Sequence, residues 1–266
     1  SRLSKYTEAG QSNNTNLTAL QHLAIAFPVK KHFGLAVGIR PYARKGYGFD
    51  SGTSVNGDSI VYKYSGTGGI NEVYLGLSSD IVKFKSFRMA VGANLGYLSG
   101  ESTNTRKSGL YSTTSNNISG GVDTKVIDLN TFHYELGTYL SYNFKIHGVT
   151  ASATFEPSQN LKGRFERAIH YSGDIDNPKF YDTLQYDVTK GVVNNAARYA
   201  FGLNYRLTLP ADDENGRKLN SELSLFGMYT IVDWSSFSNP FDGDSIAFQN
   251  STEISFGIQY APERAI

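Results

Sequence analysis

The chain has 266 residues, a formal charge of +1, 27 glycines and no cysteine. The even charge balance excludes electrostatic capture of nucleic acid, and the lack of cysteine excludes disulfide frameworks, thiolate metal sites and thiol catalysis. No run of about 18 apolar residues occurs, which excludes a transmembrane helix, whereas 18 tyrosines and 16 phenylalanines beside many Ser, Thr and Asn favour strands and turns.

Apolar and polar residues alternate in nine stretches, and this period of two predicts nine β-strands. Most of them approach the roughly 9–11 residues with which a tilted strand crosses a bilayer. A soluble β-sandwich would alternate in the same way and is the competing interpretation. In chain order the alternating apolar residues are Leu23, Ile25 and Phe27; Leu35, Val37 and Ile39; Val73, Leu75 and Leu77; Met89, Val91, Ala93, Leu95 and Tyr97; Tyr134, Leu136, Leu140, Tyr142 and Phe144; Val149, Ala151, Ala153 and Phe155; Tyr199, Phe201, Leu203, Tyr205, Leu207 and Leu209; Leu223, Leu225, Tyr229 and Ile231; and Ile254, Phe256, Ile258 and Tyr260.

The links between these strands alternate between short and long. Residues 28–32, 80–86 and 145–148 form short turns and 210–219 a moderate one, whereas residues 42–70, 99–130, 157–195 and 234–250 form long connections. Outer-membrane barrels have this asymmetry, with short periplasmic turns and longer outside loops. The sequence therefore predicts an all-β fold, a transmembrane antiparallel β-barrel that makes residues 1–266 one domain in the bacterial outer membrane.

Strand parity predicts that the chain is incomplete at both ends. Bacterial single-chain barrels have an even number of strands, whereas nine are predicted here. The first predicted strand runs from the cell exterior towards the periplasm, so the residues before it would start outside the cell. Strands hidden in the long loops are the alternative. A sheet left open in lipid would leave unpaired backbone groups, so the complete molecule is expected to close.

With the apolar rows facing lipid, the opposite rows face the lumen and carry charges of both signs. The structural interpretation is a ladder of paired Arg and Glu side chains that fills the interior. The functional interpretation is that an arginine binds a carboxylate ligand through paired hydrogen bonds. The lumen-facing set is His22, Arg40, Glu72, Tyr74, Arg88, Asn94, Glu135, Tyr139, Asn143, Glu156, Arg198, Asn204, Arg206, Glu222, Glu253 and Gln259.

The eighth strand differs because its lumen-facing row is apolar at Phe226, Met228 and, if the register is unbroken, Trp234. A bulge before Trp234 would turn that ring to lipid. An apolar inner row suits a conduit for a hydrophobic molecule, and packing against an internal plug is the alternative. The candidate ligand-contacting residues are Phe226, Met228, Trp234, Arg40, Arg198, Arg206 and Tyr74.

Signatures of catalysis are absent from the sequence. The five histidines are scattered without HExxH spacing, and no GxSxG elbow occurs. The repeated "GDSI" at residues 57–60 and 243–246 is typical of a turn, and too few carboxylates gather there for calcium. We therefore expect no enzyme activity, no cofactor and no metal site.

Four segments resemble the FadL/TodX-type outer-membrane transporters of fatty acids and other hydrophobic compounds. They are "AFPVKKHFGLAVGIRPYARKGYGF" (residues 26–49), "YSGTGGINEVYLGLS" (64–78), "YTIVDWSSF" (229–237) and "EISFGIQYAPE" (253–263). The resemblance implies a roughly fourteen-stranded barrel with an N-terminal plug, which has no counterpart in this sequence. It also implies diffusion of hydrophobic ligands through an inner pocket.

Two functions follow as hypotheses. The leading one is passive uptake of hydrophobic small molecules such as long-chain fatty acids, with outer-membrane lipid and that ligand as partners and no nucleic acid. The alternative is a structural or partner-binding subunit of a larger outer-membrane assembly such as a protein-secretion complex. The outside loops at residues 99–130 and 157–195 would then be the surfaces that bind a protein partner.

Overall fold

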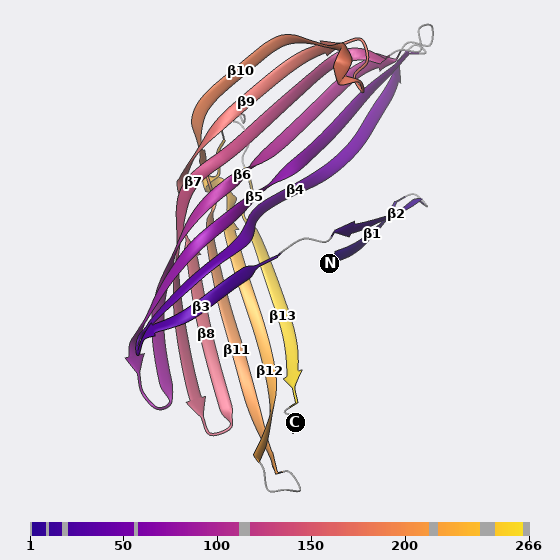
Figure 1. Ribbon diagram of the computed structural model, residues 1–266. Coiled ribbons are helices and arrows are strands. Elements are labelled where there is room, and N and C mark those ends of the chain that lie inside the picture. The colour runs from indigo at the N-terminus through magenta and orange to yellow at the C-terminus, as the bar shows by residue number, and fades with distance from the viewer. Residues whose placement is uncertain are drawn as a thin grey trace.

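A computed structural model describes residues 2–8, 11–17, 21–55, 58–111, 118–212, 218–239 and 248–262. Nearly all of them lie in antiparallel strands, and eleven strands form one curled sheet (Figure 1). This confirms the predicted antiparallel all-β fold, built as a single curled sheet and not as two packed sheets. None of the described residues belongs to a helix with the length and apolar character to cross a membrane.

All nine predicted strands are present, as β3 to β8 and β11 to β13. Along the sheet they follow the order β13-β12-β11-β8-β7-β6-β5-β4-β3, and neither β3 nor β13 has a partner on its free edge in the described part of the chain, so the sheet is a half-barrel. A separate hairpin joins β1 (Arg2–Glu8) to β2 (Gln11–Leu17). The nine strands are β3 (Leu23–Lys30), β4 (Phe33–Val55), β5 (Asp58–Lys83), β6 (Phe87–Tyr111), β7 (Ile118–Phe144), β8 (His147–Glu156), β11 (Ala197–Asp212), β12 (Lys218–Asp233) and β13 (Ser251–Ala261).

Two of the predicted long loops are wrong, because the strands continue through them. β4, β5, β6 and β7 have 23, 26, 25 and 27 residues, and the pairing extends to Val55↔Asp58 and to Tyr111↔Ile118. At roughly 3.3 Å per residue, the longest spans about 90 Å. The segments were missed because Ser, Thr and Gly occupy many of their positions, so no alternation of apolar and polar residues marks them.

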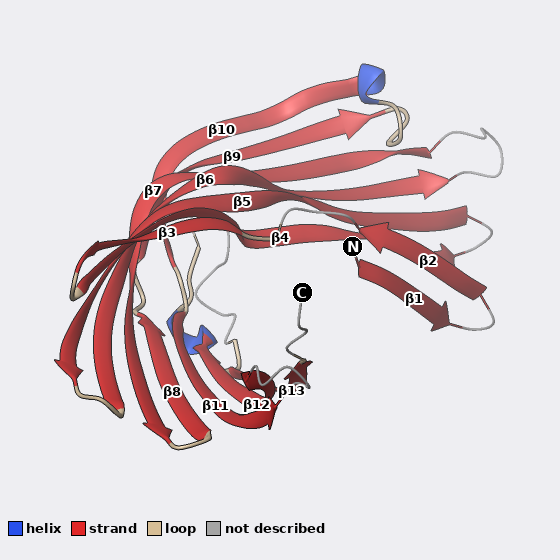
Figure 2. Cartoon of the chain, turned by 60° about the horizontal axis from the view of Figure 1, so that its bottom comes forward, coloured by secondary structure: helices blue, strands red, loops and turns tan. Residues whose placement is uncertain are grey.

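The third long loop holds two further strands, β9 (Asn160–Ser172) and β10 (Tyr181–Asn194), joined through the short 3₁₀ helix η1 (Pro178–Phe180). Strands hidden in the loops, the less favoured alternative, are therefore present. β7 pairs with β8 near its C-terminal end and with β9 near its N-terminal end, so the sheet forks along β7. Figures 1 and 2 show the two parts diverging. We call residues 43–69, 100–129 and 160–194 the wing.

The bend into the wing has a local cause in three adjacent strands. The pairing of β4 with β5 shifts by one residue at Tyr42, a β-bulge that re-aims the strand. Gly68 in β5 and Gly100 in β6 have φ of 131° and 148°, where a side chain would be strained. A Cβ on either would also collide with the neighbouring strand, so glycine is required at the fork.

We call the rest of the eleven-stranded sheet, outside the wing, the lower sheet. Its two faces differ as the alternation predicts. One row of each strand is buried or faces the concave side, and the other exposes large apolar side chains, which we call the belt. In the wing segments of β5 and β6 the corresponding outward positions, such as Ser65, Thr67, Thr103 and Thr105, are polar. The belt includes Leu23, Ile25, Phe27, Val37, Val73, Leu75, Leu77, Val91, Leu95, Phe132, Tyr134, Leu136, Phe201, Leu203, Leu225, Ile254, Phe256 and Ile258.

Candidate functional site

An apolar cluster joins the wing to the lower sheet on the concave side. Its six side chains come from β5, β6, β7, β9 and β10, so it forms only because the five strands converge at the fork. Tyr42, Ile127 and Phe237 pack against it. We call the cluster the junction core; its members are Ile70, Leu98, Leu129, Leu161, Phe165 and Val193.

A charged cluster lies beside the junction core, centred on Arg40 of β4. The Arg40 Nε donates to Glu72 Oε2 at 2.6 Å and its Nη2 donates to Glu135 Oε2 at 2.8 Å. The guanidinium also lies 5.2 Å from the centre of the Tyr74 ring. The Glu72 side chain is fully buried, so Arg40 stabilises a carboxylate that water does not reach.

His133 of β7 connects this pair to a third carboxylate. Its Nε2 lies 3.0 Å from Glu72 Oε1 and its Nδ1 lies 3.7 Å from Glu156 Oε1, although neither approach has aligned hydrogen-bond geometry. Gly96 on β6 pairs opposite His133, and a Cβ at this glycine would overlap both the imidazole and the Glu72 carboxylate. The glycine therefore makes room for the contact.

Glu156 ties the cluster to the base of the wing. The Tyr42 hydroxyl donates to Glu156 Oε1 at 2.7 Å, and Asn195 Nδ2, just after β10, donates to the same oxygen at 2.9 Å. Among the described residues no group of three or more acidic or histidine side chains is arranged to hold a metal ion. Since the carboxylates already bond Arg40, Tyr42 and Asn195, the cluster has a structural role: it links neighbouring strands.

The structure brings together only some of the residues singled out from the sequence. Arg40 and Tyr74 meet in the charged cluster, where the Tyr74 hydroxyl and His22 Nε2 are 2.6 Å apart. Arg206 lies elsewhere and donates to Asn143 Oδ1 at 2.9 Å. Arg198 is exposed on β11, and no described carboxylate lies within ion-pair distance of it.

Phe226 and Met228 stay together on the inner row of β12 but do not line an enclosed pocket. Their side chains are 47% and 42% exposed. The hollow next to them, of about 830 Å³, is bordered mainly by belt residues of the same strands, so it is a depression in an apolar surface. Its other lining residues include Leu140, Ala151, Ala153, Phe201, Leu203, Leu225, Tyr229, Ile254 and Phe256.

The unbroken register expected at Trp234 is wrong. β12 ends at Asp233, whose side chain accepts a hydrogen bond from the Ser235 amide, and Trp234 begins the 3₁₀ helix η2 (Trp234–Ser236). Trp234 Nε1 donates to Ser251 Oγ at 2.9 Å, and its ring meets Phe237 edge-on at 5.7 Å. The tryptophan therefore belongs to the base of the wing and not to a strand row.

The outer edge of the wing is an exposed feature that the sequence analysis does not predict. β10 pairs with β9 on one side; on the other side the described part of the chain gives it one isolated bridge, Asn194↔Ser238 at its C-terminal end, and every residue from 182 to 190 is exposed. The exposed fractions are 58% for Phe180, 67% for Leu184, 58% for Tyr186 and 43% for Val188. We call these four residues the wing edge.

Polar contacts hold the wing edge in place. The Tyr186 hydroxyl donates to Glu166 Oε2 at 2.9 Å, and this bond raises the pKa of Tyr186. Arg167 makes two hydrogen bonds to the Asp123 carboxylate, at 3.0 and 2.9 Å, which raise the pKa of Arg167.

The turn between β9 and β10 is anchored to two other strands of the wing. Asp176 Oδ2 accepts from Lys63 Nζ at 2.6 Å, and Asp176 Oδ1 lies 3.6 Å from Lys107 Nζ. The hydrogen bond from Lys63 lowers the pKa of Asp176 and raises that of Lys63. The adjoining Ile175 is fully buried, so the turn is fixed by packing as well as by charge.

A sequence signal for the charged cluster did exist. Glu72, Glu135 and Glu156 all fall in the predicted lumen-facing rows, whereas His133 is one of five histidines without a recognisable spacing. Their convergence depends on the register of β5, β6, β7 and β8, which a single sequence does not contain.

Comparison with known proteins gives a family match. The family model BamG matches residues 1–265, and no curated protein and no solved structure matches the chain. The FadL/TodX resemblance is therefore wrong: its motifs are short strand and turn patterns that unrelated barrels share. Uptake of fatty acids, which rested largely on that resemblance, is contradicted by the same match. Since the model covers almost every residue, this chain belongs to the BamG family.

Proposed function

We propose that this chain is a non-catalytic, partner-binding β-barrel subunit of an outer-membrane assembly, the Bam complex to which its family name refers. Family membership supports a protein partner and an outer-membrane location, in line with the all-β fold. The alternative hypothesis drawn from the sequence, a subunit of a larger assembly, is favoured over uptake of small molecules.

The belt supports a membrane placement of the lower sheet. Its exposed apolar side chains cover the strands from β3 to β13, while the outward positions of β4, β5 and β6 in the wing, such as Gly46, Thr67 and Thr103, are polar or small. Lipid-facing surfaces of membrane barrels are apolar bands about 25 Å tall. On this arrangement the wing extends well beyond the bilayer into water.

The wing edge is the observation that carries the proposal. An exposed strand edge offers unpaired N–H and C=O groups, which proteins normally cover, charge or keep short. β10 has 14 residues and presents Leu184, Tyr186 and Val188 beside that edge. Free backbone groups next to alternating apolar side chains fit an extended segment of a protein partner, which would add a strand to the sheet.

The test is a triple variant, Leu184→Ser, Tyr186→Ser and Val188→Ser, in the tagged full-length chain expressed in its native membrane. A matched control carries Gln185→Ala, Asp187→Ala and Thr189→Ala, which change alternate positions of the same strand. Quantitative mass spectrometry of the purified complex measures the other Bam subunits. We expect the wing-edge variant to lose them at least tenfold while the control keeps them.

Equal recovery of these subunits by both variants would contradict the proposal, provided that both variants reach the membrane in normal amounts. Recovery of the wild-type chain without any stoichiometric protein partner would sink it as well.

A further inference from the structure

Positive charge is concentrated at the end of the sheet opposite the wing. The three short turns together with the strand residues next to them, residues 28–34, 80–88 and 143–148, carry six cations and one carboxylate, Asp80, a net charge of +5 (six minus one) in a chain whose total is +1. The segment between β11 and β12, residues 212–218, holds three acidic and two basic residues. We call Lys30, Lys31, Lys83, Lys85, Arg88 and Lys145 the basic rim.

Most of this charge has no partner in the described part of the chain. Asp80 binds Arg88 Nε at 2.6 Å and lies 3.7 Å from Lys83 Nζ, which occupies both of its oxygens. Lys30, Lys31 and Lys85 are exposed, and none of the described carboxylates is within ion-pair distance of them. Three lysines at two neighbouring turns are therefore available to an external anion.

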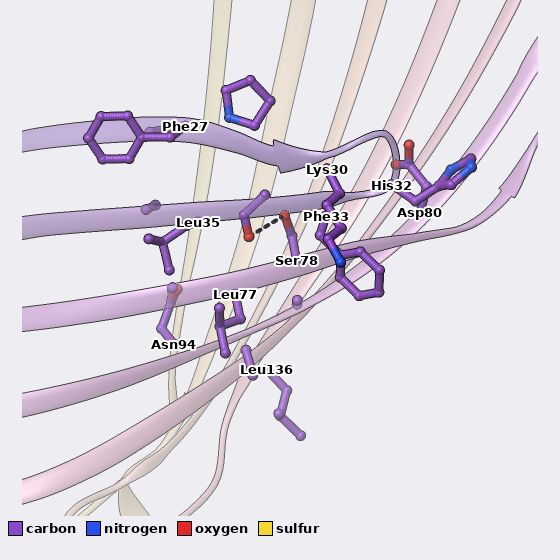
Figure 3. A pocket seen from close by; sticks show the side chains of 18 of the residues that line it. Phe27, Lys30, His32, Phe33, Leu35, Leu77, Ser78, Asp80, Asn94 and Leu136 are labelled. Atoms are coloured by element: carbon purple, nitrogen blue, oxygen red, sulfur yellow. Dashed lines mark hydrogen bonds between the residues drawn. The ribbon is translucent and has the colours of Figure 1, made fainter.

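A hollow of about 540 Å³ opens between these turns (Figure 3). Lys30, Lys31, His32, Lys83 and Arg88 line it together with Asp80. Small residues on the inner rows, among them Gly34, Gly76 and Gly92, leave the space open. The hollow is large enough for a small polar group with negative charge.

Large apolar side chains alternate with the lysines at the same level. Phe84, between Lys83 and Lys85, is 73% exposed, and Phe33 and Phe144 are 55% and 53% exposed. The Lys145 ammonium lies 5.4 Å from the centre of the Phe144 ring. Lysines whose stems cover apolar surface while their charged ends reach outward, with aromatic rings beside them, are typical of a membrane interface.

We propose that the basic rim binds the headgroups of anionic phospholipids. The free lysines lie at the turns, and the outward face of the adjoining strands exposes Phe27, Phe33 and Leu77. An occupant that binds these lysines from the outward side therefore meets cations at the rim and hydrocarbon next to it. An anionic phospholipid matches both, whereas an acidic protein surface matches only the charge. The inference rests on the membrane placement of the lower sheet proposed above.

The experiment exchanges the full-length chain from detergent into nanodiscs of phosphatidylethanolamine with or without phosphatidylglycerol. Native mass spectrometry then gives the ratio of phosphatidylglycerol to phosphatidylethanolamine that stays bound. The test variant is Lys30→Gln, Lys31→Gln and Lys85→Gln; the control is Lys162→Gln, Lys179→Gln and Lys190→Gln, three exposed lysines on the wing.

We expect the wild-type chain and the control to enrich phosphatidylglycerol. In the rim variant the ratio of bound phosphatidylglycerol to phosphatidylethanolamine should fall more than tenfold, since each lysine near an anionic surface raises the affinity about fivefold. Insertion into both lipids with no phosphatidylglycerol preference, or a preference that survives in the rim variant, would overturn the inference and leave the membrane placement standing. Failure to insert would overturn both. An acidic protein that the wild type binds and the rim variant loses, without lipid enrichment, would replace the lipid as occupant.

Discussion

Arg40 shows how one side chain joins three strands of the half-barrel, and its cluster extends to a fourth. It bonds Glu72 on β5 and Glu135 on β7, while His133 extends the contact towards Glu156 on β8. A buried ion pair adds little over a well-packed apolar pair, but removing one partner leaves an uncompensated charge. The cluster therefore makes the fold sensitive to single substitutions at the fork.

At the residue scale, we expect Arg40→Leu to lower the free energy of unfolding by about 3 kcal/mol, because Glu72 would remain buried without its cation. Fluorescence of Trp234, the only tryptophan, reports unfolding in urea from the base of the wing. Arg198→Leu is the matched control, since exposed Arg198 has no ion pair with a described carboxylate, and it should change stability by less than about 0.5 kcal/mol. Equal effects of the two substitutions would show that the cluster contributes nothing specific.

At the scale of elements, the long hairpins of the wing are stabilised mainly by pairing with each other. β5 and β6 stay in register from Ser59↔Tyr111 to Lys83↔Arg88, with one shift between Asp80 and Val82. Such a ladder satisfies the backbone hydrogen bonds without an apolar face on both sides, so the outward face of these two strands can be polar in the wing. Its outermost turn then needs a separate anchor, which Asp176 provides.

The anchor of the β9–β10 turn should depend on pH. The pKa of Asp176 is lowered, so its stabilisation is present above the usual aspartate range near 4 and disappears as the pH falls through the lowered value. The pKa of Lys63 is raised, so its share persists below the usual lysine range and disappears as the pH rises through the raised value. As a partly exposed pair, the anchor contributes under about 1 kcal/mol.

Amide hydrogen exchange of residues 174–177, corrected for the intrinsic rate at each pH, measures this effect. We expect protection to fall several-fold when the pH drops from 7 to below 3, and expect Asp176→Asn to show the lower protection at every pH. A wild-type turn whose protection does not change with pH would contradict the assignment.

At the scale of the whole molecule, the hairpin of β9 and β10 is an insertion between Gln159 and Asn195, two residues that hydrogen-bond to each other. The Asn195 amide donates to the Gln159 carbonyl at 3.1 Å, and the Gln159 amide donates to Asn195 Oδ1. Residues 160–194 can therefore be replaced by two glycines without moving β8 or β11, which pair directly from Arg198↔Glu156 to Leu207↔His147.

We expect this excision to preserve the strand content seen by circular dichroism, because the lower sheet keeps its pairing. Stability should drop by several kcal/mol, since Leu161, Phe165 and Val193 leave the junction core and uncover Ile70, Leu98 and Leu129. The protein partner should be lost along with the wing edge. Full partner binding by the excised chain would place the interface on another part of the molecule.

A region could be predicted from the sequence where a local pattern of apolar and polar residues defines it, and could not where contacts between distant segments define it. Residues 198–209 alternate without interruption, and β11 forms there as predicted. Residues 160–172 show no regular alternation of apolar and polar residues, so nothing marks β9, whereas Leu184, Tyr186 and Val188 alternate with polar residues and are a sequence signal for β10. Trp234 was assigned to a strand row because alternation cannot indicate where a strand ends, and here Asp233 caps a 3₁₀ turn instead.

The sequence by itself determined the strand class and which row of each lower strand faces outward, because the period of two is a local property of the backbone. Only the tertiary structure decided that the sheet forks along β7, that β10 is left with a free edge, and that Arg40, Glu72, Glu135, His133 and Glu156 meet. These outcomes depend on the register between strands far apart in the chain, and register is a relation between segments that no single segment encodes.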